Sequence, residues 1–380
     1  MRVIMNQVLA VIPNKNPPPS EPTAKQFNAN EEAQVGAVDT RALPSIIPTT
    51  IVRLLNLTGK DGQPTPIFKT SVSKGVADII GEKGYTLLEV IGRGAFGCVY
   101  RAHYDQAVRI GGGGPPALTY DVACKQIDLV SDKKKTNKTL LGFDKRRLET
   151  LGRELTVMEK LVHHQHVISL YEHLIIDYQV FIIMEYAHGG SLFQYLKDKG
   201  ALPERFARKF MLQLCDAVRY MHSKGFSHRD LKLQNILIMK PSKRGTLKIA
   251  DFGLSRVHYT GDYLCYSHCG TPLYMAPEII AVKMAQQKSE LAYPYNPMRS
   301  DIWALGICLY ALLNRAWPFD DDKTDMYARM LNRDWKFSKK IRESVSPELL
   351  DFLNALLEPD PRKRITFFGI YSHRWFLDSK

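Results

Sequence analysis

Apolar residues follow two different patterns along this 380-residue chain, and the change between these patterns predicts the architecture. From Tyr85 onward, short apolar runs typical of β-strands prevail. We expect strands at 85–91, 120–127, 167–174 and 180–186. After the second strand, apolar residues recur at intervals of three and four, which predicts an amphipathic helix; they are Leu148, Leu151, Leu155, Met158 and Leu161.

Helical periodicity dominates after Ser191, and long helices are expected at 204–223 and 300–314. A β-rich part therefore precedes a helix-rich part, and the junction falls at 185–190. This order predicts an α+β fold of two lobes, a small β-rich N-terminal lobe and a larger helical C-terminal lobe.

The first 80 residues have a different pattern, with many prolines separated by small polar residues. Proline interrupts both helices and sheet interiors, so we expect residues 1–80 to form a disordered extension without a core. Two further loops interrupt the folded part: a glycine-proline stretch at 111–116 and a polar stretch at 281–296.

Charge adds little to this picture. The chain has 52 Lys and Arg against 39 Asp and Glu, a net charge of +13. Either acidic partners or a basic surface without a special partner accounts for it. A basic stretch at 133–147 resembles a two-part nuclear localisation signal, although a solvated loop is the simpler interpretation. Nucleic-acid binding is not expected, since no aromatic-basic recognition motif accompanies the charge.

The six cysteines form no CxxC pair, which favours reduced thiols and a cytoplasmic protein. Nuclear entry is left open by the basic stretch. No apolar run approaches the roughly 20 residues that a membrane span needs, so we expect no membrane insertion.

Candidate chemistry begins with glycines between two predicted strands. Gly92, Gly94 and Gly97 have the GxGxxG spacing, in which backbone N–H groups approach phosphate oxygens without an intervening Cβ. A strand follows the last glycine, whereas a helix follows it in dinucleotide-binding folds. We assign the whole loop to the nucleotide: Ile91, Gly92, Arg93, Gly94, Ala95, Phe96, Gly97, Cys98 and Val99.

The next strand ends in Val-Ala-Cys-Lys, which places Lys125 where it can reach the α- and β-phosphates. Its expected partner is Glu154, which lies four residues before Met158 and so shares that residue's inner helix face. Glu149 and Glu159 are the alternatives.

The sequence His-Arg-Asp-Leu-Lys-Leu-Gln-Asn at 228–235 supplies the reacting groups. Asp230 is expected to accept or orient the proton of an attacking hydroxyl, and Lys232 to steady the γ-phosphate. Asn235, and Asp251 of a following Asp-Phe-Gly, are expected to bind Mg²⁺.

Together these motifs, with Ala-Pro-Glu at 276–278, resemble the eukaryotic protein kinase family over residues 85–376. The resemblance implies ATP and Mg²⁺ as cofactors, an N-lobe at 85–184 and a C-lobe at 188–376. It also implies that Met184 is the gatekeeper and that Glu185 and Ala187 border the adenine. Further implied contacts are a regulatory spine (Met158, Leu170, His228 and Phe252), a Glu278–Arg364 pair and a brace from Asp301.

Lys232 and the Gly-Thr-Pro at 270–272 resemble the serine/threonine class, which implies protein substrates with Ser or Thr acceptors. The segments 267–272 and 317–321 are similar to the calcium/calmodulin-dependent group. Segments 295–301 and 357–360 are most similar to testis-specific serine kinases, and relatives of the AMP-activated kinase come second. Direct calmodulin control is not expected, since the chain ends four residues after Phe376.

One departure concerns substrate choice. In many kinases of the group that this chain resembles, carboxylates bind an arginine upstream of the target serine. The positions that align with those carboxylates hold neutral residues here, namely Ser191, Gln234 and Ala311. Losing a charge-assisted contact removes about 1.5–3 kcal/mol of recognition, so we expect weak selection for upstream arginine.

Arg229 beside Asp230 indicates control by phosphorylation of the loop between Asp251 and Glu278. Ser267 is the preferred site, with Arg229 and Arg256 as ligands of its phosphate and an upstream kinase as the activator. An ordinary exposed serine is the alternative. The rival function for the chain is a pseudokinase scaffold that binds partners through the same fold.

Overall fold

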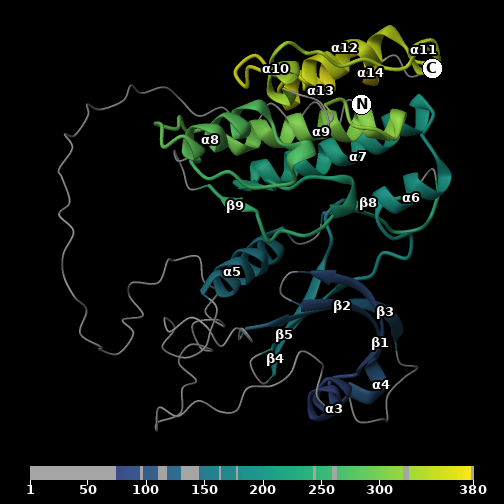
Figure 1. The fold of residues 1–380 in the computed structure, drawn as a ribbon. Coiled ribbons are helices and arrows are strands. Elements are labelled where there is room, and N and C mark those ends of the chain that lie inside the picture. The colour runs from purple at the N-terminus through teal and green to yellow at the C-terminus, as the bar shows by residue number, and fades with distance from the viewer. Residues whose placement is uncertain are drawn as a thin grey trace, which may run out of the picture. The chain divides into compact units, whose positions relative to one another are not determined.

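A computed structural model describes residues 74–94, 97–109, 118–129, 145–161, 164–176, 179–242, 245–258, 263–319 and 325–377. The glycine-proline loop and most of the basic stretch lie outside these ranges. Figure 1 shows a sheet followed along the chain by a group of helices. The predicted two-lobed α+β fold is confirmed.

The N-lobe contains an antiparallel sheet of five strands in the order β1-β2-β3-β5-β4. Its members are β1 (Tyr85–Gly94), β2 (Gly97–Asp105), β3 (Thr119–Asp128), β4 (Leu170–Ile176) and β5 (Gln179–Glu185). A short helix, α4 (Gln106–Arg109), follows β2. The third predicted strand begins at Leu170 rather than at residue 167.

Both faces of this sheet are covered, as the apolar run in β5 requires. Phe181 and Ile183 pack in one cluster with Val76 and Ile80 of α3 (Lys74–Glu82). Val180 and Ile182 alternate with them and belong to a second cluster, which includes α5 (Lys145–Lys160) and continues into the C-lobe. The predicted apolar stripe of α5 is buried, from Leu148 to Leu161.

The helix α3 corrects the predicted boundary of the N-terminal extension. Residues 74–80 were expected to lack a core, yet Val76 and Ile80 are buried at 3% and 0% exposure. Proline content misplaced the boundary because it says nothing about a short amphipathic helix that the sheet stabilises. Residues 1–73 of the expected extension lie outside the described part of the chain.

The C-lobe is built around α7 (Glu204–Ser223) and α9 (Pro297–Asn314), which contact each other. Other helices surround them: α6 (Leu192–Lys199), α8 (Pro277–Gln287), α10 (Met326–Leu331), α11 (Lys339–Arg342), α12 (Pro347–Leu356), α13 (Phe367–Ser372) and α14 (Arg374–Leu377). Part of the expected polar loop at 281–296 is therefore helical. None of the helices in the described ranges has the length and apolarity to cross a membrane.

Short elements between α6 and α8 hold the candidate chemistry. Two strand pairs, β6 (Phe226–Ser227) with β9 (Arg256–Val257) and β7 (Ile236–Ile238) with β8 (Leu247–Ile249), flank the segments around Asp230 and Asp251. The 3₁₀ turns η2 (Leu233–Asn235) and η3 (Pro272–Tyr274) complete this region.

Candidate active site

The glycine loop joins β1 to β2, with Gly94 paired to Gly97. Ala95 and Phe96, which follow Gly94 in the sequence, lie outside the described residues. Gly97 tolerates no side chain, because an added Cβ would lie 1.9 Å from the carbonyl oxygen of Gln126. The remaining loop residues assigned to the nucleotide are on β1 and β2: Ile91, Gly92, Arg93, Cys98 and Val99. Val99 lies opposite Lys125 in the sheet register, so the loop and the lysine are adjacent.

Lys125 on β3 contacts carboxylates from two other elements. Its Nζ lies 2.5 Å from Oε1 of Glu154 on α5 and 3.7 Å from Oδ1 of Asp251. Glu154, the predicted partner of Lys125, is therefore the carboxylate that meets this lysine. Burial alone would lower the pKa of Lys125, but the charges of Glu154 and Asp251 outweigh it and raise that pKa. The ammonium stays charged, as phosphate binding requires.

Asp230 and Lys232 form a compact network with Thr271. Nζ of Lys232 lies 2.6 Å from Oδ2 of Asp230 and donates to Oγ1 of Thr271 at 2.9 Å. That hydroxyl in turn donates to Oδ1 of Asp230 at 2.8 Å. Thr271 was interpreted only as a marker of the serine/threonine class, and its contact with Asp230 was missed. The Gly-Thr-Pro motif was the available signal.

Asn235 and Asp251 present oxygen ligands suited to a hard cation. The side-chain NH₂ of Asn235 donates to the Asp230 carbonyl at 2.9 Å, which leaves its Oδ1 as an available acceptor. The Asp251 carboxylate is half exposed, and the residue has a left-handed backbone with φ 65°. An amide oxygen and a carboxylate, completed by phosphate oxygens, fit the preference of Mg²⁺.

Asp301 of α9 binds the backbone that precedes Asp230. The Asp301 carboxylate accepts the N–H groups of His228 at 2.8 Å and Arg229 at 2.9 Å, and also a ring contact from His222. Burial would raise the pKa of Asp301, but these donors, led by His222, keep it lowered. The brace holds Arg229 at φ 68°, a conformation that is costly for a non-glycine residue.

Three residues of the implied regulatory spine belong to or pack against one apolar cluster, and the fourth, His228, lies beside Phe252. Met158, His228 and Phe252 are buried, and Leu170 packs against the same cluster. The rings of His228 and Phe252 have centroids 5.6 Å apart. This packing connects α5 with the Asp-Phe-Gly segment.

Ser267 lies within reach of Arg229, as expected for a regulated loop. Nη2 of Arg229 donates to Oγ of Ser267 at 2.6 Å, and Tyr295 donates to the Ser267 carbonyl at 2.8 Å. The Cys265 sulfur is 3.2 Å from the same hydroxyl. Arg256 is on β9, opposite Ser227 in the register. The serine is exposed, so a kinase can approach it.

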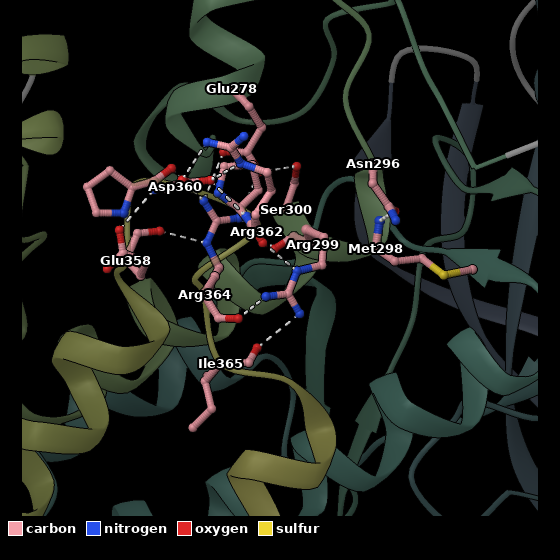
Figure 2. Close-up of polar contacts among 12 residues, drawn as sticks. Glu278, Asn296, Met298, Arg299, Ser300, Glu358, Asp360, Arg362, Arg364 and Ile365 are labelled. Carbon is pink, nitrogen blue, oxygen red and sulfur yellow. Dashed lines mark hydrogen bonds and ion pairs between the residues drawn. The ribbon is translucent and has the colours of Figure 1, made fainter.

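The end of the loop is anchored by the pair implied between Glu278 and Arg364. Figure 2 shows the Arg364 guanidinium directed at the Glu278 carboxylate, with distances of 2.7 and 2.9 Å. Arg364 also donates to the carbonyls of Glu358 and Arg299. Its side chain is fully buried, so every donor direction is occupied by protein.

Comparison with known proteins agrees with this geometry. Residues 85–376 match the family described as protein kinase domain. CBL-interacting protein kinase 1 of Oryza sativa is 38% identical over 63% of this chain and 48% of its own length. Serine/threonine-protein kinase kin-29 of Caenorhabditis elegans is 33% identical over 77% of this chain but 30% of its own. CBL-interacting serine/threonine-protein kinase 20 of Arabidopsis thaliana is 34% identical over 78% and 60%. The chain thus spans less than two thirds of these relatives.

Proposed function

The chain belongs to the protein kinase family, and we propose that it is an active serine/threonine kinase that transfers the γ-phosphoryl group of ATP to protein hydroxyls. The observation that carries this proposal is the position of Lys125 between Glu154 and Asp251, at 2.5 and 3.7 Å. That contact joins the nucleotide lysine of the N-lobe to the metal ligand of the C-lobe. Relatives named as serine/threonine kinases support the same class.

The residues divide the reaction between them. Lys125 holds the α- and β-phosphates, aided by the glycine loop, while backbone atoms of Glu185 and Ala187 border the adenine. Asp230 orients the acceptor hydroxyl and takes its proton, and Lys232 stabilises the charge on the transferred group. Asn235 and Asp251 would hold Mg²⁺, which would neutralise phosphate charge.

Alignment of the acceptor depends on the network around Asp230. Thr271 and Lys232 occupy different oxygens of the Asp230 carboxylate, at 2.8 and 2.6 Å. With both oxygens held, the carboxylate keeps one orientation, and a correctly placed base contributes more than a mobile one. The same network links this base to the loop that carries Ser267.

We further propose that the substrate groove selects weakly for upstream arginine. Ser191 caps helix α6 by accepting the Gln194 N–H at 3.2 Å, and Gln234 is exposed and neutral. Ala311 is 2% exposed and presents no polar group. Nothing charged stands at these three positions to attract a guanidinium.

Phosphorylation of Ser267 by an upstream kinase is the proposed activating step. A phosphate on that hydroxyl would replace the 2.6 Å hydrogen bond between the Arg229 cation and a neutral hydroxyl by an ion pair, with Arg256 as a second ligand. The loop would then be ordered around Asp230 and Thr271.

Similarity of several segments supports placement in the calcium/calmodulin-dependent group, near the testis-specific serine kinases. The proposed domain is 85–376, with an N-lobe at 85–184, a C-lobe at 188–376 and an extension before α3. We propose a cytoplasmic location, with nuclear entry through the basic stretch as an alternative.

Phosphorylation of a degenerate serine/threonine peptide library with Mg²⁺ and ATP tests the main proposal. We expect incorporation by the wild type and none by Asp251→Asn. If the wild type with phosphoserine at 267 incorporates nothing, the pseudokinase scaffold replaces the enzyme.

A further inference from the structure

A lysine stands in the middle of β8, where both neighbours are core residues. Leu247 and Ile249 are fully buried, and Lys248 between them is only 8% exposed. Its Nζ lies 2.8 Å from Oε2 of Glu185 and donates to the carbonyl of Val167 at 3.3 Å. Burying an ammonium is costly unless such partners compensate it, so this side chain has a defined position.

The carboxylate that Lys248 meets belongs to the segment that borders the adenine. Glu185 is the last residue of β5, and its side chain also accepts the Ser169 N–H at 3.3 Å. Its own N–H donates to the Ser169 carbonyl at 3.0 Å. Side chain and backbone therefore hold Glu185 against the segment that precedes β4.

The same segment is held against β8. The N–H of Ile168 donates to the Ile249 carbonyl, and the N–H of Ile249 donates to the His166 carbonyl, each at 2.9 Å. The His166 ring contacts the Leu247 carbonyl at 2.9 Å. Two residues beyond Ile249 the chain reaches Asp251. One ammonium group thus connects the end of β5 with the strand that leads to the metal ligand.

We propose that Lys248 is a positioning residue for nucleotide binding, which acts through Glu185 and fastens the adenine-bordering segment to the strand that leads to Asp251. This inference rests on the proposed kinase function. A segment held in place before the nucleotide arrives loses less conformational freedom on binding. The Lys248–Glu185 pair should therefore increase nucleotide affinity.

The inference is tested by titrating the full chain with Mg²⁺ and ATP in a calorimeter, which needs no turnover. We expect Lys248→Met to weaken ATP binding by about tenfold and Lys248→Arg by less than about threefold, since arginine keeps the charge and the donors. Adenosine, which has no phosphates, should lose affinity in parallel. The peptide KM should stay unchanged.

Glu204→Gln serves as the control for general destabilisation. Glu204 is a largely buried carboxylate of the C-lobe that accepts from Ser346, Trp375 and Arg208. The Glu204→Gln substitution should lower the melting temperature without weakening ATP binding. If Lys248→Met fails to fold, Lys248→Gln keeps a donor and replaces it in the titration.

Unchanged ATP affinity in the folded Lys248 variant, with a lowered melting temperature, would overturn the inference and leave a purely structural pair. A wild type that binds no ATP would instead contradict the proposed kinase function. Failure of the Lys248 inference and failure of the proposed function therefore give different results. Weakened ATP binding in Lys248→Met but not in Glu204→Gln supports the positioning role of the Lys248–Glu185 pair.

Discussion

The guanidinium of Arg229 donates a 2.6 Å hydrogen bond to the hydroxyl of Ser267, although 38 residues separate them in the chain. Arg229 directly precedes Asp230, so the proposed phosphorylation of Ser267 would act one residue away from the proposed base. The Asp301 carboxylate accepts the backbone N–H of the same Arg229 at 2.9 Å. The contact explains how modification of an exposed loop can reach the reacting groups.

Phosphoserine incorporated genetically at position 267 should raise kcat by at least about tenfold, because charge-assisted bonds to Arg229 order the loop. Ser267→Ala should stay at the basal rate. Arg229→Gln should lose the response while mass spectrometry still detects the phosphate. Equal rates for the phosphorylated and unmodified chains would contradict this switch.

Lys125→Met should lower kcat/KM for a peptide substrate by about 100-fold or more, since the phosphates lose their fixed cation. Steady-state assays at varied ATP concentration measure this loss. Lys160→Met, at an exposed end of α5, removes the same charge away from the site and should have little effect. Comparable activity in the two variants would argue against the assigned role.

Ser191→Asp should introduce selection for arginine upstream of the target residue, by about tenfold in kcat/KM on matched peptides. Aspartate keeps the N-cap of α6 and adds the missing charge. Ser191→Ala should cost about 1 kcal/mol of stability through loss of the cap and leave specificity unchanged. Strong selection for upstream arginine by the wild type would contradict the proposal that its substrate groove selects weakly for this residue.

Arg364→Met should destabilise the C-lobe by about 3–5 kcal/mol, because Glu278 is left as a buried carboxylate without its cation. Urea denaturation followed by tryptophan fluorescence measures the change. Arg362→Met breaks an exposed pair with Asp360, which solvent screens, and should have little effect on stability. Similar losses from the two variants would show that burial does not govern these pairs.

Asp216 predicts a pH-dependent part of the stability. A hydrogen bond from His164, followed by one from Arg219, lowers its pKa from 3.8 to about 2 against the opposing effect of burial. Because the folded pKa lies below the unfolded one, ionisation stabilises the fold above about pH 4, and this contribution is lost as the pH falls towards 2. Its size is on the order of 1 kcal/mol, given partial exposure.

Urea denaturation of Asp216→Asn against the wild type measures that contribution. The difference in unfolding free energy should be largest above pH 5 and shrink as the solution becomes more acidic. A difference that is constant over this range would exclude the titration of Asp216 as its source.

The sequence by itself determined the fold class and the main order of the elements, and it supplied the proposed reacting groups. The short apolar run of β5 and the 3.6-residue periodicity of α5 identify these elements because burial acts on each residue locally. Glu154 was chosen correctly as the neighbour of Lys125 because its place on the inner face of a single helix is a local property. Short motifs around Asp230 and Asp251 likewise depend on fixed local spacing.

Only the tertiary structure decided which distant residues complete the site. Thr271 meets Asp230, and Lys248 meets Glu185, through contacts across 41 and 63 residues that no periodicity specifies. The packing of α3 on the sheet is of the same kind, since Val76 and Ile80 have no core until the strands provide one. Such contacts form when separate elements pack together, and their energies depend on burial and geometry that exist only in the assembled chain.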